Sequence, residues 1–241
     1  MKNSIKLITL MLSIFLAFTS NNNYAQKSKF KGIVTYDIKY SGKDLTPAQE
    51  TQLPKEETVK IYENKTLQEL KQGPVTIDFI TNGEEGSKTM LLDLMAVAQK
   101  KVYVKTTKQE IEQEIAESKI KPSIIYIDST KEIAGYKVKK ALYCYKNEDS
   151  VDSTKLVIWY NAELGGADIY FTDMISGMMF EGLKGFPLEY EIQIKTVTKK
   201  NTAKTIVKGK VKETEFLIPT DYTQITQEEL QGMMGGGGGD E

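Results

Sequence analysis

Alternation of apolar and polar residues with a period of two is the dominant pattern in this chain. It is most regular in FKGIVTYDIKY (residues 30–40) and in FPLEYEIQIKT (residues 186–196). Successive side chains of a strand point to opposite faces, so each stretch presents one apolar and one polar face. We therefore expect two half-buried antiparallel strands, one near each end of the chain.

Weaker alternation predicts further strands between and after these two. Turn-forming residues separate most of them, at Lys71–Pro74, Asn82-Gly83 and Asn201. The spacing is about ten residues and no helix of a dozen residues alternates with the strands, which favours a meandering antiparallel sheet over a parallel fold. The additional strands are predicted at Thr58–Glu63, Val75–Thr81, Lys88–Leu94, Lys101–Lys105, Ile124–Asp128, Gly135–Tyr145, Lys155–Tyr160 and Lys204–Lys212.

Two short helices are also predicted. TTKQEIEQEIAESK has Thr106 or Thr107 as a cap and is otherwise strongly charged, which is typical of a surface helix between strands. TQEELQGMM has Thr226 followed three residues later by Glu229, the spacing of a capping box. The stretch ADIYFTDMISGMMF is compatible with a short helix, a strand or a loop.

The first 25 residues are typical of a secretory signal. Lys2 and Lys6 precede a short apolar run, and a small residue, Ala25, stands where cleavage is expected. The run is shorter than the roughly 18 apolar residues that a membrane span needs. We expect a signal peptide at 1–25, one β domain at 26–222, and a short helix with a disordered glycine-rich tail at 223–241, in a periplasmic or secreted protein.

Composition narrows the possible chemistry. All 32 basic residues are lysines, against 33 acidic residues, and there is no histidine. A near-neutral chain has no electrostatic reason to bind nucleic acid. Without histidine, a Ser-His-Asp mechanism and a histidine-containing zinc site are both excluded. Cys144 is the only cysteine, so an internal disulfide is impossible. We expect no cofactor, no metal site and no enzymatic activity.

Three local motifs have an ordinary structural interpretation. The glycines of FEGLKGFPLEYEI (residues 180–192) precede a strand rather than a helix, so they favour a turn over a phosphate-binding loop. The acidic stretch NEDSVDST (residues 147–154) is typical of a hairpin tip, with a weak calcium site as the alternative. It also contains Asp-Ser-Val and Asp-Ser-Thr triplets, which occur again as Asp128-Ser129-Thr130 and are similar to O-glycosylation acceptors of secreted bacteroidete proteins.

The ordered motifs resemble those of a family of secreted bacteroidete proteins of unknown function with a LolA-like, lipoprotein-carrier-like fold. The pieces that carry the resemblance are FKGIVTYDIKY, TKEIAGYKVKKALY, LVIWYNAEL, GLKGFPLEYEI and FLIPTDY. The resemblance spans residues 30–222. It implies a strongly curved antiparallel sheet, a half-barrel with a few short helices over its concave face, that encloses an apolar cavity for acyl chains.

Two functions follow as expectations. The first is binding of a lipid or acyl chain against the concave face, because cavities of this kind have mostly apolar walls. The second is a non-enzymatic structural or protein-interaction module of the envelope, in which the same residues form a plain core. The oligomeric state is not predicted. The candidate cavity lining consists of Phe30, Val34, Tyr36, Ile38, Trp159, Phe186, Leu188, Tyr190 and Ile192.

Overall fold

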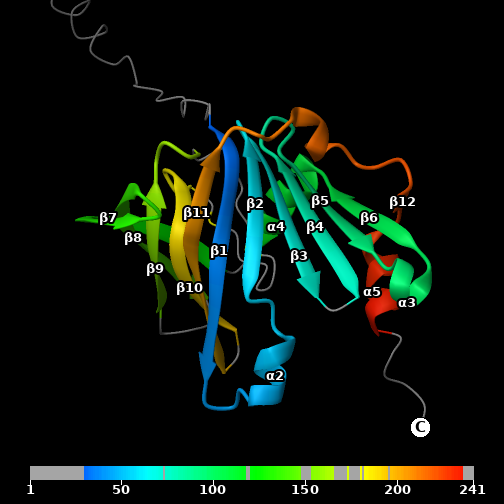
Figure 1. The fold of residues 1–241 in the computed structure, drawn as a ribbon, viewed down its shortest axis with the longest axis horizontal. Helices are drawn as coiled ribbons and strands as arrows, with labels where there is room; N and C mark the ends of the chain where they lie inside the picture. The colour runs from blue at the N-terminus through cyan, green and yellow to red at the C-terminus, as the bar shows by residue number, and fades with distance from the viewer. Residues whose placement is uncertain are drawn as a thin grey trace, which may run out of the picture.

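The chain is organised around one twelve-stranded sheet (Figure 1). The structure, a computed structural model, describes residues 30–72, 74–117, 120–147, 153–165, 173, 180, 182–194 and 196–235. The strands are β1 (Lys31–Gly42), β2 (Glu56–Tyr62), β3 (Lys65–Gln72), β4 (Val75–Asn82), β5 (Ser87–Asp93), β6 (Lys101–Thr106), β7 (Ile120–Ile133), β8 (Tyr136–Asn147), β9 (Ser153–Asn161), β10 (Phe186–Ile194), β11 (Val197–Lys208) and β12 (Thr223–Gln224). The helices are α2 (Pro47–Gln52), α3 (Met95–Ala98), α4 (Lys108–Glu117), the 3-10 helix η2 (Glu213–Phe216) and α5 (Gln227–Gly235).

The strands follow the order β12-β6-β5-β4-β3-β2-β1-β11-β10-β9-β8-β7. Every pair is antiparallel except the short parallel pair of β12 with β6. In the antiparallel part of the sheet, neighbouring strands follow one another along the chain, with one exception. The exception is the pairing of β1 with β11, which joins strands far apart in the sequence. The predicted mainly β fold with a meandering antiparallel sheet is confirmed.

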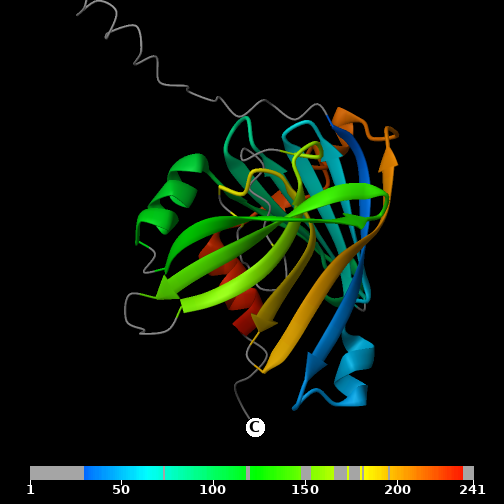
Figure 2. The same cartoon turned by 90° about the vertical axis from the view of Figure 1, so that its left-hand side faces the viewer.

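The sheet is open and strongly curved. Figure 2 shows the green strands β7, β8 and β9 turned well away from the direction of the blue β1, so that the sheet bends around an interior. Twist of this kind accumulates from strand to strand because each strand has a right-handed twist. The predicted curved sheet with few short helices is therefore also confirmed, and its two edges are β7 and β12.

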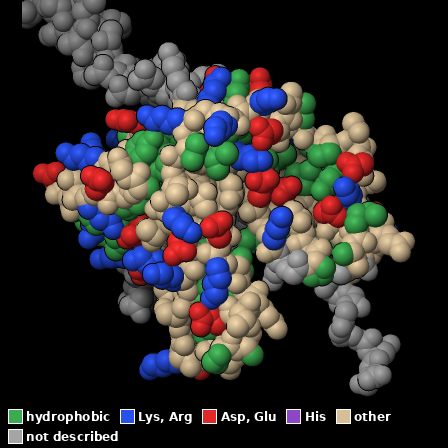
Figure 3. Space-filling view, in the orientation of Figure 1, with side chains coloured by type: hydrophobic (Ala, Val, Ile, Leu, Met, Phe, Trp, Pro, Cys, Tyr) green, Lys and Arg blue, Asp and Glu red, His purple; other side chains and the backbone are tan. Residues whose placement is uncertain are grey.

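The two faces of the sheet bury different cores. On the concave face, the largest apolar cluster joins β1 and β2 to β8–β11 and packs against Leu164, Phe180 and Leu183. On the same face at the other end, Leu230 of α5 packs on Leu92 and the valines of β6. On the convex face, Phe216 of η2 covers Leu67 and Ile80. Figure 3 shows lysines and acidic side chains interspersed over the convex side of the molecule.

Both predicted helices are present with the expected caps. Glu110 accepts hydrogen bonds from the backbone N–H and the hydroxyl of Thr107 at the start of α4. Glu229 accepts from the N–H of Thr226, and its own N–H donates to the Thr226 hydroxyl. These reciprocal bonds satisfy N–H groups that have no partner within a helix. The described helices include none that is long and apolar enough to cross a membrane.

Four strands differ from the sequence prediction. Strand β7 runs from Ile120 to Ile133 instead of Ile124–Asp128, and the two-residue β12 was not predicted. Strand β3 was not predicted either, and β11 spans Val197–Lys208 instead of Lys204–Lys212. Asn201, predicted as a turn residue, is fully buried in the middle of β11. In β3 and β11 polar side chains face the interior, namely Thr66 and Gln68 in β3 and Lys199 and Asn201 in β11, and these interrupt the expected apolar alternation.

Other predictions fall on residues with little or no description. The signal peptide at 1–25 and the end of the tail lie outside the described residues, as do most of ADIYFTDMISGMMF and the middle of NEDSVDST. Asp128-Ser129-Thr130 lies in β7 at an irregularity in its pairing with β8. Gly185 precedes β10, and a Cβ there would lie 2.6 Å from the carbonyl oxygen of Asn161, which explains a glycine at the start of this strand.

Candidate ligand site on the concave face

The predicted lining residues form a packed core in this structure. Seven of the nine belong to the largest apolar cluster, each at most 9% exposed: Phe30, Val34, Tyr36, Phe186, Leu188, Tyr190 and Ile192. Ile38 is also buried on the same face. Their side chains pack against one another and against the segment that covers them, with edge-to-face contacts between Tyr190 and the rings of Tyr36 and Phe180.

Trp159 is placed differently from the other eight. It lies between the inward-facing Ile158 and Tyr160 of β9, so its indole is directed to the convex face. There the Nζ atoms of Lys131 and Lys140 lie 4.4 and 5.7 Å from the ring centroid. Trp159 is half-buried and packs only against the margin of the concave core.

A cluster of charged and polar side chains is buried beside this core. Lys199 Nζ lies 2.6 Å from Asp173 Oδ2 and 3.8 Å from Glu57 Oε2, and all three side chains are at most 1% exposed. The Tyr190 hydroxyl donates to Asp173 Oδ2 over 3.1 Å, and Asn201 Nδ2 donates to Glu57 Oε2 over 3.0 Å. We call these five residues the buried charge cluster. No local sequence pattern indicates this cluster, because its members are scattered from position 57 to position 201.

Burial dominates the electrostatics of the cluster. It raises the pKa of Glu57 to about 7, although Lys199 opposes this shift. It also raises the pKa of the Tyr190 and Tyr36 hydroxyls well above their usual value. The Tyr36 hydroxyl donates to the carbonyl oxygen of Pro187. Through these contacts the cluster links Asp173 to β11 and β10, and Glu57 of β2 to β11.

A pocket opens on the concave face at the other end of the sheet, between α4 and the start of α5. We call it the concave pocket, and its volume is about 1050 Å³. Half-buried Phe79 of β4 and Met90 of β5, together with buried Val104 of β6, form an apolar floor. Its charged lining residues are Glu110, Glu114, Glu228, Glu229, Lys88 and Lys105. Most of the other lining residues are polar, so the floor is the part of this pocket that has the apolar composition usual for a small-molecule site.

The floor residues could have been found from the sequence. Phe79 alternates with Ile77, Met90 with Leu92, and Val104 with Val102, all within strands that were predicted. Their register places them side by side, since Phe79 pairs with Met90 and Met90 with Val104. The sequence does not show that α4 and α5 leave these three floor residues uncovered.

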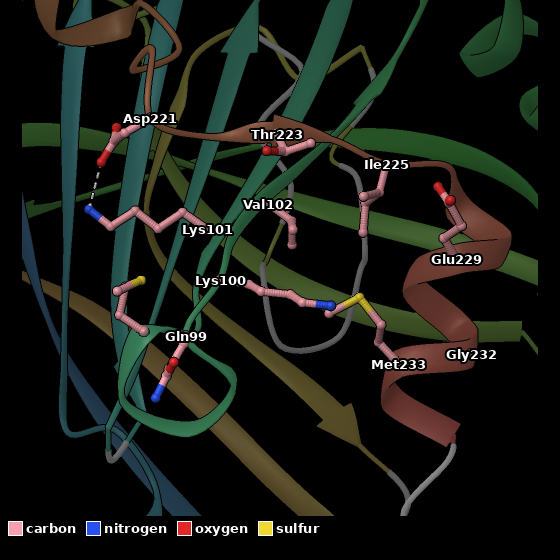
Figure 4. Close-up of a pocket in the computed structure, with 11 residues that line it drawn as sticks. Gln99, Lys100, Lys101, Val102, Asp221, Thr223, Ile225, Glu229, Gly232 and Met233 are labelled. Carbon is pink, nitrogen blue, oxygen red and sulfur yellow. Dashed lines mark hydrogen bonds and ion pairs between the residues drawn. The ribbon is translucent and has the colours of Figure 1, made fainter.

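A second pocket, of about 950 Å³, lies on the other side of α5 (Figure 4). An ion pair crosses its rim, with Lys101 Nζ 2.9 Å from Asp221 Oδ2. Met95 of α3 and Met233 of α5 are exposed here, at 50% and 40%. A smaller pocket of about 610 Å³ lies on the convex face between Ile80 and Phe216. In the described part of the chain, no group of three or more histidine, cysteine or acidic residues could hold a metal ion.

Comparison with known proteins supports the fold. No protein-family model matches the sequence, and the search of curated proteins found no match. Among solved structures, the chain is similar to PNGF-II in two crystal forms, P21 and C2, with TM-scores of 0.51 and 0.52 and 17% sequence identity. The similarity covers 85% of this chain, but only 33% and 32% of PNGF-II, so this chain spans about a third of that protein's length.

A LolA superfamily protein from Nitrosomonas europaea is a weaker structural neighbour. Its TM-score is 0.25 and its identity 11%, over 79% of this chain and 91% of that protein. A score this low supports no inference about function. At 17% identity, the likeness to PNGF-II shows a shared fold alone.

Proposed function

We propose that this protein is a non-enzymatic binding protein for an apolar or amphipathic ligand, such as a lipid or acyl chain, and that it acts in the periplasm or outside the cell. The basic and apolar start of the sequence supports that location. The observation that carries the binding function is the concave pocket with its floor of Phe79, Met90 and Val104.

The size of the concave pocket and its apolar floor support this proposal. Small-molecule sites typically have volumes of about 300–1000 Å³, and this pocket is slightly larger at about 1050 Å³. The floor belongs to three neighbouring strands in regular register, so cross-strand hydrogen bonds hold its backbone in place. Most of the flanks come from α4 and α5, which can adjust more easily than paired strands.

The ligand would lie on a different part of the concave face from the predicted lining residues. The side chains around Tyr36 and Tyr190 pack together as part of the largest apolar cluster and stabilise the fold. The concave pocket lies on the same face, beyond β3.

Binding of the fluorescent probe N-phenyl-1-naphthylamine tests this function. We expect its emission to rise when it enters the concave pocket and to fall when an unlabelled acyl compound displaces it. Met90→Asp should abolish the rise, because it introduces a charge into the apolar floor. Met95→Asp, in the second pocket, is the matched control and should leave binding unchanged. Loss of binding only in the Met95 variant, or no binding by the natural chain, would contradict the proposal.

A protein-interaction role is the second candidate, and the β7 edge favours it. This strand is 14 residues long and pairs on one side with β8, while Ile125 and Tyr126 are exposed at 51% and 38%. Exposed strand edges can accept a further strand from a partner. Cross-linking from a residue at this edge, such as Asp128→Cys, in envelope extracts would show a specific adduct if this role is real.

A further inference from the structure

Among the described residues of the concave face, three fully buried polar side chains have no hydrogen-bond partner. Thr66 and Gln68 of β3 and Thr81 of β4 are each 0% exposed. Four of their polar atoms, Thr66 Oγ1, Gln68 Oε1 and Nε2, and Thr81 Oγ1, have no partner. We call these three residues the inner polar triad. Buried polar side chains in native proteins are nearly always hydrogen-bonded, so four unsatisfied atoms on adjacent residues require an explanation.

The inner polar triad adjoins the floor of the concave pocket. Thr66 pairs with Thr81 across β3 and β4, and Gln68 pairs with Phe79. Thr81 in turn pairs with Lys88 of β5. Since directly paired residues have side chains on the same face, the triad lies on the concave face next to Phe79 and Lys88, both of which line the pocket. The pocket therefore ends beside the unsatisfied polar atoms.

The chemistry of the triad selects one kind of partner. It offers hydroxyl and amide donors together with hydroxyl and amide acceptors, and it contains no charged group. A charged head placed there would lose its hydration without gaining a counter-ion, which is strongly unfavourable. The acidic residues at the pocket mouth further disfavour an anion, because four acidic side chains face two lysines in the lining.

The geometry points to a site for the neutral polar head of an amphipathic ligand, with the head hydrogen-bonded to Thr66, Gln68 and Thr81 and the apolar part on Phe79, Met90 and Val104. This inference rests on the proposed function and names its ligand class. The four atoms are shielded from solvent in the structure. The side chains at the inner end of the pocket must therefore move on binding, and Phe79, paired with Gln68, is placed to do so.

Three ligands with the same ten-carbon chain test the inference: 1-decanoylglycerol with a neutral head, decanoate with an anionic head and decyltrimethylammonium with a cationic head. Their affinities are measured by displacement of N-phenyl-1-naphthylamine at pH 7.5, below the micellar concentration of each. We expect the glycerol ester to bind at least about tenfold more tightly than either ion, as one or more buried hydrogen bonds would give.

Variants separate the triad from the rest of the pocket. Gln68→Leu and Thr81→Val should each reduce the preference for the neutral head while the chain still binds the probe. Thr89→Val is the matched control, because Thr89 is a buried threonine in β5 that lines the convex pocket. It should retain the full preference.

The outcomes distinguish this inference from the proposed function. If all three ligands displace the probe equally, or if Gln68→Leu and Thr81→Val keep the natural preference, the triad is only an unsatisfied part of the core and the inference is wrong, while the binding function stands. If neither the probe nor any ligand binds, both are wrong.

Discussion

Strands β10 and β3 are both central in the sheet and both bury their concave faces, but with opposite chemistry. The inward residues of β10 are Phe186, Leu188, Tyr190 and Ile192, and they join the packed apolar core. The inward residues of β3 are Thr66, Gln68 and Leu70, and the first two are polar and unpartnered. A place within the sheet therefore does not require an apolar inward face, since each strand is paired with a neighbour on both sides.

This contrast explains which strands could be predicted from the sequence. Strand β10 was predicted from its alternation, whereas β3 and the first half of β11 were not, because Gln68, Lys199 and Asn201 interrupt the apolar pattern on the buried side. Pattern-based prediction detects burial only through apolar residues. Both of these stretches contribute to buried polar groups: β3 supplies Thr66 and Gln68 of the inner polar triad, and β11 supplies Lys199 and Asn201 of the buried charge cluster.

Eight of the nine predicted lining residues share the concave face with the concave pocket, but none of the nine is among its walls. A ligand site at the predicted residues stays a prediction. The sequence shows which residues share a face of a strand. It does not show which part of that face the covering segments fill, since that depends on contacts of Leu164, Phe180 and Leu230 with strands distant in the chain.

The largest expected effect comes from breaking the buried charge cluster. Lys199→Met removes the buried cation that lies 2.6 Å from Asp173 Oδ2 and 3.8 Å from Glu57 Oε2, which should lower the free energy of unfolding by about 3–5 kcal/mol. Urea denaturation measures the change. Lys200→Met is the matched control at the next, outward-facing position, where ion pairs with Glu189 and Glu191 are partly exposed. It should cost no more than about 1 kcal/mol, and equal losses in the two variants would contradict the account.

Truncation in β10 should have the next largest effect. Leu188 is fully buried in the packed core, so Leu188→Ala leaves a cavity and should destabilise the fold by roughly 2–5 kcal/mol. Affinity for N-phenyl-1-naphthylamine should stay the same under conditions where the variant is folded, because Leu188 does not line the concave pocket. A clear gain in probe binding would show that the packed core around β10 accepts ligands when space is provided. It would contradict the assignment of ligand binding to the concave pocket alone.

The pH dependence of stability tests the buried carboxyl of β2. The pKa of Glu57 is raised to about 7, from 4.5, so the folded state holds this proton more tightly than the unfolded state. The stabilisation is fully present below pH 4.5 and is lost as the pH rises toward 7. We therefore expect the free energy of unfolding of the natural chain to fall by about 1–3 kcal/mol between pH 5 and 8.

Glu57→Gln should remove most of this decline, because the glutamine is neutral throughout and can still accept from Asn201. Denaturation curves at pH 5, 6, 7 and 8 measure it. Glu56→Gln is the control, since Glu56 is exposed on the opposite face and pairs with Lys204. A decline of the same size in all three proteins would assign the pH dependence to other groups.

The smallest effect is expected in β3 and has the opposite sign. Gln68→Leu replaces two unsatisfied polar atoms with an apolar group of similar size, so it should raise the free energy of unfolding by about 1 kcal/mol or more in the absence of ligand. Gln113→Leu, on the exposed surface of α4, should change stability by no more than about 0.5 kcal/mol. Destabilisation by Gln68→Leu would mean that its amide is hydrogen-bonded in solution.

Methyl NMR of the natural chain compares the two regions directly while 1-decanoylglycerol is added. The methyl groups of Met90 and Val104 report on the concave pocket, and those of Leu188 and Ile192 report on the packed core. We predict saturable shifts of the Met90 and Val104 signals, with the Leu188 and Ile192 signals unchanged. Shifts confined to Leu188 and Ile192, or no saturable shift at any of the four residues, would contradict a ligand site in the concave pocket.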